Sequence, residues 1–141
     1  MADPELDRLI ARLNDPSMGG RGQATYQLAA KGAAAIPCLL AAAEGRWKNH
    51  FGVACSNDSQ IRRGAIIALR KMGASAADAV STLTQLLSDD DPVLRWESAQ
   101  ALEEIGGAAR SAIPALESLV GDPHYDVRAA ALQALRQLAV R

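Results

Sequence analysis

The sequence contains few aromatic residues, although almost half of it is hydrophobic. Aromatic residues make up 4% of the 141 positions, against 49% for all hydrophobic types, and alanine is very abundant. A core built from small aliphatic side chains lets helices approach each other closely. Valine, isoleucine and threonine never alternate at a period of two, so strands are not expected. The composition therefore favours one all-α domain spanning residues 1–141.

Strong charge, long apolar runs and a cysteine framework are also missing. The formal net charge is −1, so no overall positive field attracts a nucleic-acid backbone or an acidic membrane. No apolar run approaches the roughly 18 residues of a membrane span, and the acidic, amphipathic N-terminus does not resemble a secretory signal. Cys38 and Cys55 could form one disulfide, but nothing else indicates a disulfide scaffold. We expect a cytoplasmic protein with reduced thiols.

An internal repeat of about 33 residues organises the chain. In residues 91–106, DPVLRWESAQALEEIG, a Leu-Arg pair is followed by Ala-Leu seven residues later and then by Ile-Gly. The arginine of this frame recurs as Arg21, Arg62, Arg95 and Arg128. An apolar half-motif with helical spacing precedes each arginine and begins near Pro4, Ile36, Val80 and Ile113. Each unit therefore reads as helix A, a loop and helix B.

Glycines and spacings mark the limits of the units. Glycines near the ends of the B helices, Gly32, Gly73 and Gly106, suit left-handed caps. The A-to-B spacing is 15 residues in the third and fourth units and 26 in the second, which therefore carries an insertion at about 44–57. The sequence predicts about four helix-pair repeats, at approximately 3–32, 33–73, 74–106 and 107–141.

These motifs resemble HEAT-like repeats, and most closely the short bacterial type named after phycobilisome lyases. The segments Asp91-Pro92-Val93-Leu94-Arg95 and Ile113-Pro114-Ala115-Leu116 carry the strongest match, and the resemblance covers nearly the whole chain. It implies a right-handed α-α superhelix whose B helices line the inner, concave surface. It implies little about activity, because such arrays serve many unrelated roles.

The recurring arginines have two possible roles. They could form a basic ladder that grips phosphates, or they could pair with nearby loop aspartates within the scaffold. The candidate aspartates are Asp15, Asp58, Asp91 and Asp126. Recurrence in every unit favours the structural role, and the resemblance implies the same.

One face of the B helices carries candidate binding residues. Positions one, five and eight residues after the arginine share a face, which includes Arg63, Arg70, Trp96 and Gln100. Tryptophan and arginine dominate binding hot spots. Trp96 has no counterpart at its position in the other units, so we predict that it contacts a partner. The alternative is that Trp96 packs locally over the loop.

Aromatic residues concentrate in the A-to-B loops. Trp47 and Phe51 lie in the insertion, Tyr125 lies in the loop of the fourth unit, and Trp96 opens a B helix. All such loops leave a solenoid on the same edge, so these rings should cluster there. They could bind a partner or form a small core that packs the insertion down. The predicted partner-binding residues are therefore Trp47, Phe51, Arg63, Arg70, Trp96, Gln100 and Tyr125.

No catalytic residue, metal ligand or cofactor is predicted. His50 and Cys55 in the insertion could be a ligand pair or a nucleophile and base, but no third partner accompanies them. We expect a non-catalytic protein–protein interaction or scaffold module.

Two other functions remain open. The resemblance to phycobilisome-lyase-type repeats implies a possible role in attaching or detaching a bilin, in which Cys55 and His50 would matter. A nucleic-acid role would need a continuous basic groove, and the acidic Glu97, Glu103 and Glu104 of the third repeat argue against it. The C-terminal helix, residues 127–140, lacks a polar outer face, so Ala129, Ala130 and Leu132 should be only partly covered. This end is expected to self-associate, or to continue into a longer array.

Overall fold

The computed structural model describes residues 3–56 and 58–139, and the regular elements in this part of the chain are helical. The α-helices are α1 (Pro4–Ala11), α2 (Met18–Ala30), α3 (Ile36–Ala43), α4 (Ser59–Met72), α5 (Val80–Leu86), α6 (Pro92–Ile105), α7 (Ile113–Ser118) and α8 (Tyr125–Ala139). Short 3-10 helices cover Arg12–Asn14, Gly32–Ala35, Gly73–Ala79, Gly106–Ala112 and Leu119–Gly121. The predicted all-α class is confirmed.

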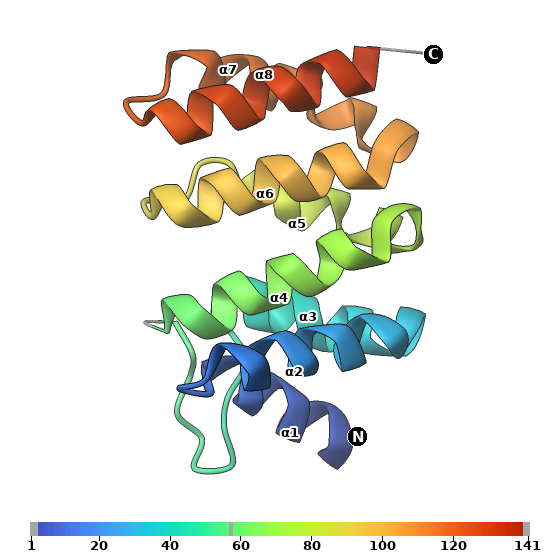
Figure 1. Ribbon diagram of the computed structural model, residues 1–141, viewed down its shortest axis with the longest axis vertical. Coiled ribbons are helices and arrows are strands. Elements are labelled where there is room, and N and C mark those ends of the chain that lie inside the picture. The colour runs from blue at the N-terminus through green and yellow to red at the C-terminus, as the bar shows by residue number, and fades with distance from the viewer. Residues whose placement is uncertain (1–2, 57, 140–141) are drawn as a thin grey trace.

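The helices stack as pairs in two layers. The second helices of the pairs, α2, α4, α6 and α8, lie side by side in one layer, and each packs against the next. Helices α3, α5 and α7 form the layer behind them, and the described chain starts at one end of the stack and finishes at the other (Figure 1). The architecture is the predicted superhelix of helix pairs.

Capping residues explain where several helices begin and end. The carboxylate of Asp91 accepts the Val93 N–H at the start of α6, and Pro92 occupies the first turn, where no N–H is needed. The Ser17 hydroxyl caps α2 in the same way, so this helix forms despite its three glycines. Gly73 and Gly106 follow α4 and α6 with φ of 56° and 81°, a conformation that favours glycine.

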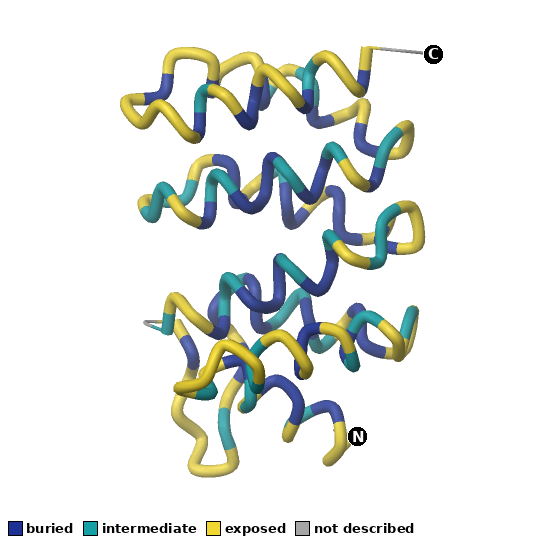
Figure 2. Tube along the Cα trace, in the orientation of Figure 1, coloured by how far each residue is buried: buried dark blue, intermediate teal, exposed yellow. Residues whose placement is uncertain are grey.

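The core lies between the two layers, as the buried stretches in Figure 2 show. Leu69, Leu83, Leu102 and Leu116 are completely buried along the stack. Burial of each such leucine contributes about 2 kcal/mol. Alanine fills many of the remaining core positions, as expected from the composition. The large aromatic exception is Trp47, which is 8% exposed.

The insertion is a hairpin that packs against the first helix. An isolated antiparallel bridge joins Lys48 to Ala54, and the Cys55 N–H donates to the Trp47 carbonyl at 2.8 Å. The Trp47 ring belongs to the core, and its Nε1–H donates to Asp7 in α1 at 3.0 Å. The Trp47 indole therefore holds the insertion down, as the alternative interpretation predicted, and it offers little surface to a partner.

The frame arginines bind the loop backbones of their own repeats. In repeat 2 the Nε of Arg62 donates to the Ala43 carbonyl at 3.0 Å. The other three arginines use Nη1 to reach the carbonyl six residues earlier, namely Arg21 to Asp15 at 2.7 Å, Arg95 to Asp89 at 2.7 Å and Arg128 to Asp122 at 2.8 Å.

Two of these arginines also bind a carboxylate of the next repeat. Arg62 donates to Asp89 at 2.7 Å, and Arg95 donates to both oxygens of Asp122, at 2.8 and 3.3 Å. The structural role predicted for the arginines is confirmed, although the paired carboxylates differ from the predicted ones. Asp58 and Asp91 cap helices. The ion pairs that join successive repeats, which we call the arginine ladder, use Asp89 and Asp122.

A long apolar stretch of the chain is bent sharply between α2 and α3. Helix α2 and the segment Gly32–Ala43 would together match a membrane span in length and composition, but they are bent by 116°. Leu28, Ile36 and Leu39 of this pair are buried in the core. In the described residues, no single helix is long and apolar enough to cross a membrane.

Candidate partner-binding face

Trp96 lies at the surface where α4 meets α6. Its ring is partly buried against the core, and the guanidinium carbon of Arg63 lies 6.0 Å from the ring centroid. A hollow of about 150 Å³ borders the ring and is lined by Pro92, Val93, Trp96, His124, Asp126 and Val127. A partly buried tryptophan that borders a hollow suits a binding anchor.

Glu97 is the central charge of this region. Its side chain is 2% exposed, with Arg63 Nη2 at 3.7 Å from Oε1 and Arg70 Nη1 at 3.9 Å from Oε2. Burial raises the pKa of Glu97, and the guanidinium groups of Arg70 and Arg63 oppose part of that effect. Glu97 is buried because its position two residues after the frame arginine faces the neighbouring helix.

Arg70 completes the cluster by binding Gln100. Arg70 Nη1 donates to the Gln100 Oε1 at 2.6 Å, from α4 to α6. The structure therefore brings together Arg63, Arg70, Trp96 and Gln100, which the sequence placed on one face. We call these four residues and Glu97 the α4–α6 seam.

Phe51 and Tyr125 are exposed and do not join the seam. Phe51 is 78% exposed in the hairpin, where its ring centroid lies 3.9 Å from that of His50. Tyr125 is 73% exposed at the start of α8, with the Arg128 guanidinium carbon 5.8 Å from its ring centroid. The predicted cluster of four aromatic rings is therefore absent from the described residues, where His50–Phe51 is the close ring pair.

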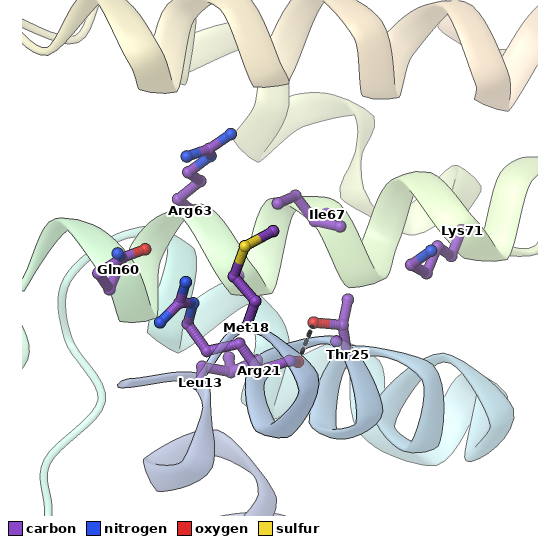
Figure 3. Close-up of a pocket in the computed structure, with 10 residues that line it drawn as sticks. Leu13, Met18, Arg21, Thr25, Gln60, Arg63, Ile67 and Lys71 are labelled. Carbon is purple, nitrogen blue, oxygen red and sulfur yellow. Dashed lines mark hydrogen bonds between the residues drawn. The ribbon is translucent and has the colours of Figure 1, made fainter. Parts of the chain in front are cut away.

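A cleft of about 300 Å³ separates α2 from α4 beside the seam. Figure 3 shows Arg21 and Met18 rising from the α2 side toward α4, which carries Gln60, Arg63, Ile67 and Lys71. The cleft is lined by Leu13, Met18, Arg21, Gly22, Thr25, Gln60, Arg63, Gly64, Ile67 and Lys71. Its lining thus combines apolar side chains with three cations and contains no acid.

The sequence placed Arg63 and Arg70 on one face with Trp96 and Gln100, but it did not reveal the cleft or the burial of Glu97. A signal for Glu97 was present, because the same frame position holds Gly64 in repeat 2 and Ala130 in repeat 4. A glutamate among small buried residues breaks that pattern. The cleft had no comparable signal, since its walls come from helices about forty residues apart in the chain.

The two cysteines are free and poorly placed for nucleophilic chemistry. Cys55 is 5% exposed, its thiol donates to the Ala42 carbonyl, and burial raises its pKa. Burial, followed by the charges of Asp7 and Asp3, raises the pKa of Cys38 to about 11. Within residues 3–56 and 58–139, no three His, Cys, Asp or Glu side chains gather where they could hold a metal ion.

Stacked helix pairs in which a recurring arginine binds the adjoining loops define an α-solenoid. The sequence matches the profile of the family described as HEAT repeats over residues 52–136, which is more than half of the chain. The chain therefore belongs to the HEAT repeat family.

Solved structures show the same architecture. The complex of CpcE and CpcF of phycocyanin lyase from Nostoc sp. PCC7120 is similar with a TM-score of 0.74 and 20% identity, over 94% of this chain and 77% of that chain. A designed armadillo repeat protein in complex with the peptide (KR)4 is similar with a TM-score of 0.65 and 18% identity, over 94% of this chain and 64% of that one. At these identities the likeness concerns the fold. A comparison with curated proteins gives no match.

Proposed function

We propose that this protein is a non-catalytic binding module of the cytoplasm that holds a protein partner against the α4–α6 seam. The observation that carries the proposal is the fixed position of Trp96 between Arg63 and the hollow at the start of α8. Tryptophan and arginine supply much of the binding energy at protein interfaces. The seam presents one tryptophan and two arginines on neighbouring helices.

The contacts within the seam hold these side chains in place before a partner arrives. The buried Glu97 carboxylate attracts the guanidinium groups of Arg63 and Arg70. The hydrogen bond to Gln100 also holds the Arg70 guanidinium in place. Side chains that are already ordered lose less conformational entropy on binding, typically about 0.5–1.5 kcal/mol less for each one. The proposed role of Glu97 is therefore to organise the arginines, while Phe51 and Tyr125 make outer contacts.

The solved structures agree with a binding role for this architecture. One similar protein is in complex with a peptide, and another is a complex of two named subunits. We extend this to the present chain as a proposal, since stacked helix pairs create long surfaces that contact extended partners.

The other functions receive less support. A bilin role through Cys55 and His50 would need an accessible thiol, whereas Cys55 is buried and His50 lies at the surface. A nucleic-acid role would need a continuous basic groove, and Glu97 interrupts the basic residues at the seam.

Self-association through α8 stays a prediction. Leu132 is 40% exposed, whereas Ala99 at the same frame position in repeat 3 is completely buried under the next repeat. Ala130 was expected to be partly covered, but it is 7% exposed because it faces α6.

Replacing Trp96 by alanine is expected to weaken partner binding at least tenfold, which corresponds to about 1.4 kcal/mol. The measurement is affinity capture from lysate of the source cell with immobilised wild-type and W96A protein, followed by titration of the captured partner. Tyr26→Ala removes another exposed aromatic ring, 70% exposed on α2, and serves as the control. Unchanged affinity of W96A, or a loss explained entirely by a lower melting temperature, would make Trp96 a scaffold residue.

A further inference from the structure

Arg21 lacks the carboxylate that Arg62 and Arg95 bind. Like Arg95, it donates from Nη1 to the carbonyl six residues earlier in its own loop. The Nε and Nη2 of Arg95 then bind Asp122, but in the described chain the same two nitrogens of Arg21 have no protein acceptor. The Asp15 carboxylate instead accepts the backbone N–H and the hydroxyl of Ser17.

The sequence explains the missing partner. The position six residues before the frame arginine is Asp89 in repeat 3 and Asp122 in repeat 4, and each carboxylate binds the arginine of the preceding repeat. Repeat 2 has Ser56 at this position, within the insertion. The unit that follows Arg21 therefore supplies no aspartate at this position.

The unpaired donors of Arg21 belong to the cleft between α2 and α4. Met18, which is 80% exposed, and Ile67 provide apolar surface beside the guanidinium, and Lys71 adds a second cation (Figure 3). A volume of about 300 Å³ holds one or two side chains of an extended segment. No acid lines the cleft, and although Arg63 pairs with Glu97, the described residues show no ion pair for Arg21 or Lys71.

We propose that this cleft binds an acidic segment of a protein partner, in which a glutamate or aspartate carboxylate takes the place of the missing aspartate on Arg21. A neighbouring apolar side chain of the segment packs against Met18 and Ile67. Charge-assisted bonds from a guanidinium to a carboxylate are directional and strong, which fixes the register of the bound segment. This inference deepens the proposed function and rests on it, because the cleft adjoins the α4–α6 seam through Arg63.

The apolar lining favours a peptide over a nucleic acid. A phosphate backbone would use Arg21 and Lys71 but would leave Met18 and Ile67 uncovered. A peptide that alternates acidic and apolar residues satisfies both kinds of surface. The acidic charge of such a peptide also complements Arg21 and Lys71, for which the described structure shows no ion pair with a carboxylate.

The test uses a fluorescein-labelled eight-residue peptide of alternating glutamate and leucine, titrated by fluorescence anisotropy against the full chain. We expect binding that weakens with added salt, and at least tenfold weaker binding of the matching glutamine–leucine peptide. Arg21→Gln should weaken binding of the acidic peptide about tenfold. Arg128→Gln is the matched control, because Arg128 has the same frame position and the same loop bond but does not line the cleft.

Equal effects of R21Q and R128Q, or no effect of R21Q, on binding of the acidic peptide would overturn the proposal.

Circular dichroism establishes that each variant is folded. Ile67→Gln provides a second variant, which alters the cleft without changing any arginine. I67Q should also weaken binding of the acidic peptide. If the captured partner depends on Trp96 but not on Arg21 or Ile67, the seam function stands and the cleft assignment is wrong. If the partner depends on none of them, both are wrong.

Discussion

Replacing Arg95 by glutamine is expected to lower the free energy of unfolding by about 3 kcal/mol and the melting temperature by about 10 °C. The side chains of Arg95 and Asp122 are 12% and 5% exposed, and the guanidinium binds both carboxylate oxygens. Loss of the guanidinium leaves the Asp122 carboxylate buried without its charged partner. The same substitution also removes the bonds to the Asp89 and Asp90 carbonyls, and calorimetry measures the combined loss.

Arg128→Gln is the control for Arg95. Arg128 makes the same loop bonds, to the Asp122 and Pro123 carbonyls, but binds no carboxylate in the described chain. Its replacement should therefore cost about 1 kcal/mol, the typical value of ordinary hydrogen bonds. Similar losses for the two variants would mean that the cross-repeat ion pair contributes little and that the loop bonds alone hold the ladder.

The pH dependence of stability provides a second readout of the same pair. Burial alone would raise the pKa of Asp122, but bonds from the His124 N–H and from Arg95 hold it below its ordinary value. A depressed pKa means that the stability from this carboxylate is present above the ordinary aspartate pKa and is lost as the pH falls through the lower folded value. R95Q should therefore lose less stability on acidification than the wild-type protein.

Replacing Gly64 by valine is expected to destabilise the fold by about 2–3 kcal/mol through overpacking. A Cβ at Gly64 would lie 2.9 Å from Cδ2 and 3.1 Å from Cβ of Leu13, which is 1% exposed and held in a short 3-10 helix. The Cβ of Leu13 is fixed by its backbone and cannot be moved by a change of rotamer, so helix α4 must shift away from the first repeat. Chemical denaturation with urea measures the loss.

Gly22→Val is the matched control within α2. A Cβ at Gly22 would meet no atom within 4 Å, so the substitution should change stability by no more than about 0.5 kcal/mol. Equal destabilisation at the two glycines would mean that contact with Leu13 does not explain the loss, since helix propensity alone favours valine over glycine.

The repeating part of the molecule could be predicted from the sequence because periodic positions share one environment. The arginines, the glycines after α4 and α6, and the A and B helices all follow the 33-residue frame. The frame also placed Arg63, Arg70, Trp96 and Gln100 on one face, and the contacts across α4 and α6 bring these residues together.

The features that escaped prediction depend on contacts outside the frame. The Trp47 indole binds Asp7, which lies 40 residues earlier, and no periodic pattern relates an insertion to the helix it covers. The carboxylates that pair with the arginines lie 27 residues after them. The sequence prediction instead chose aspartates that are closer to each arginine along the chain. The cleft beside Arg21 requires the three-dimensional placement of α2 against α4.

Photo-crosslinking tests most directly whether the partner binds the face that carries the seam. A benzoylphenylalanine at Glu103 lies on α6, on the same side of the helix as Trp96 and Gln100, and one at exposed Gln85 lies on α5 in the other layer. The proposed function predicts that the partner captured by the wild-type protein forms an adduct with position 103 and none with position 85, and that W96A abolishes the adduct. Crosslinks from position 85 but not from position 103 would contradict it.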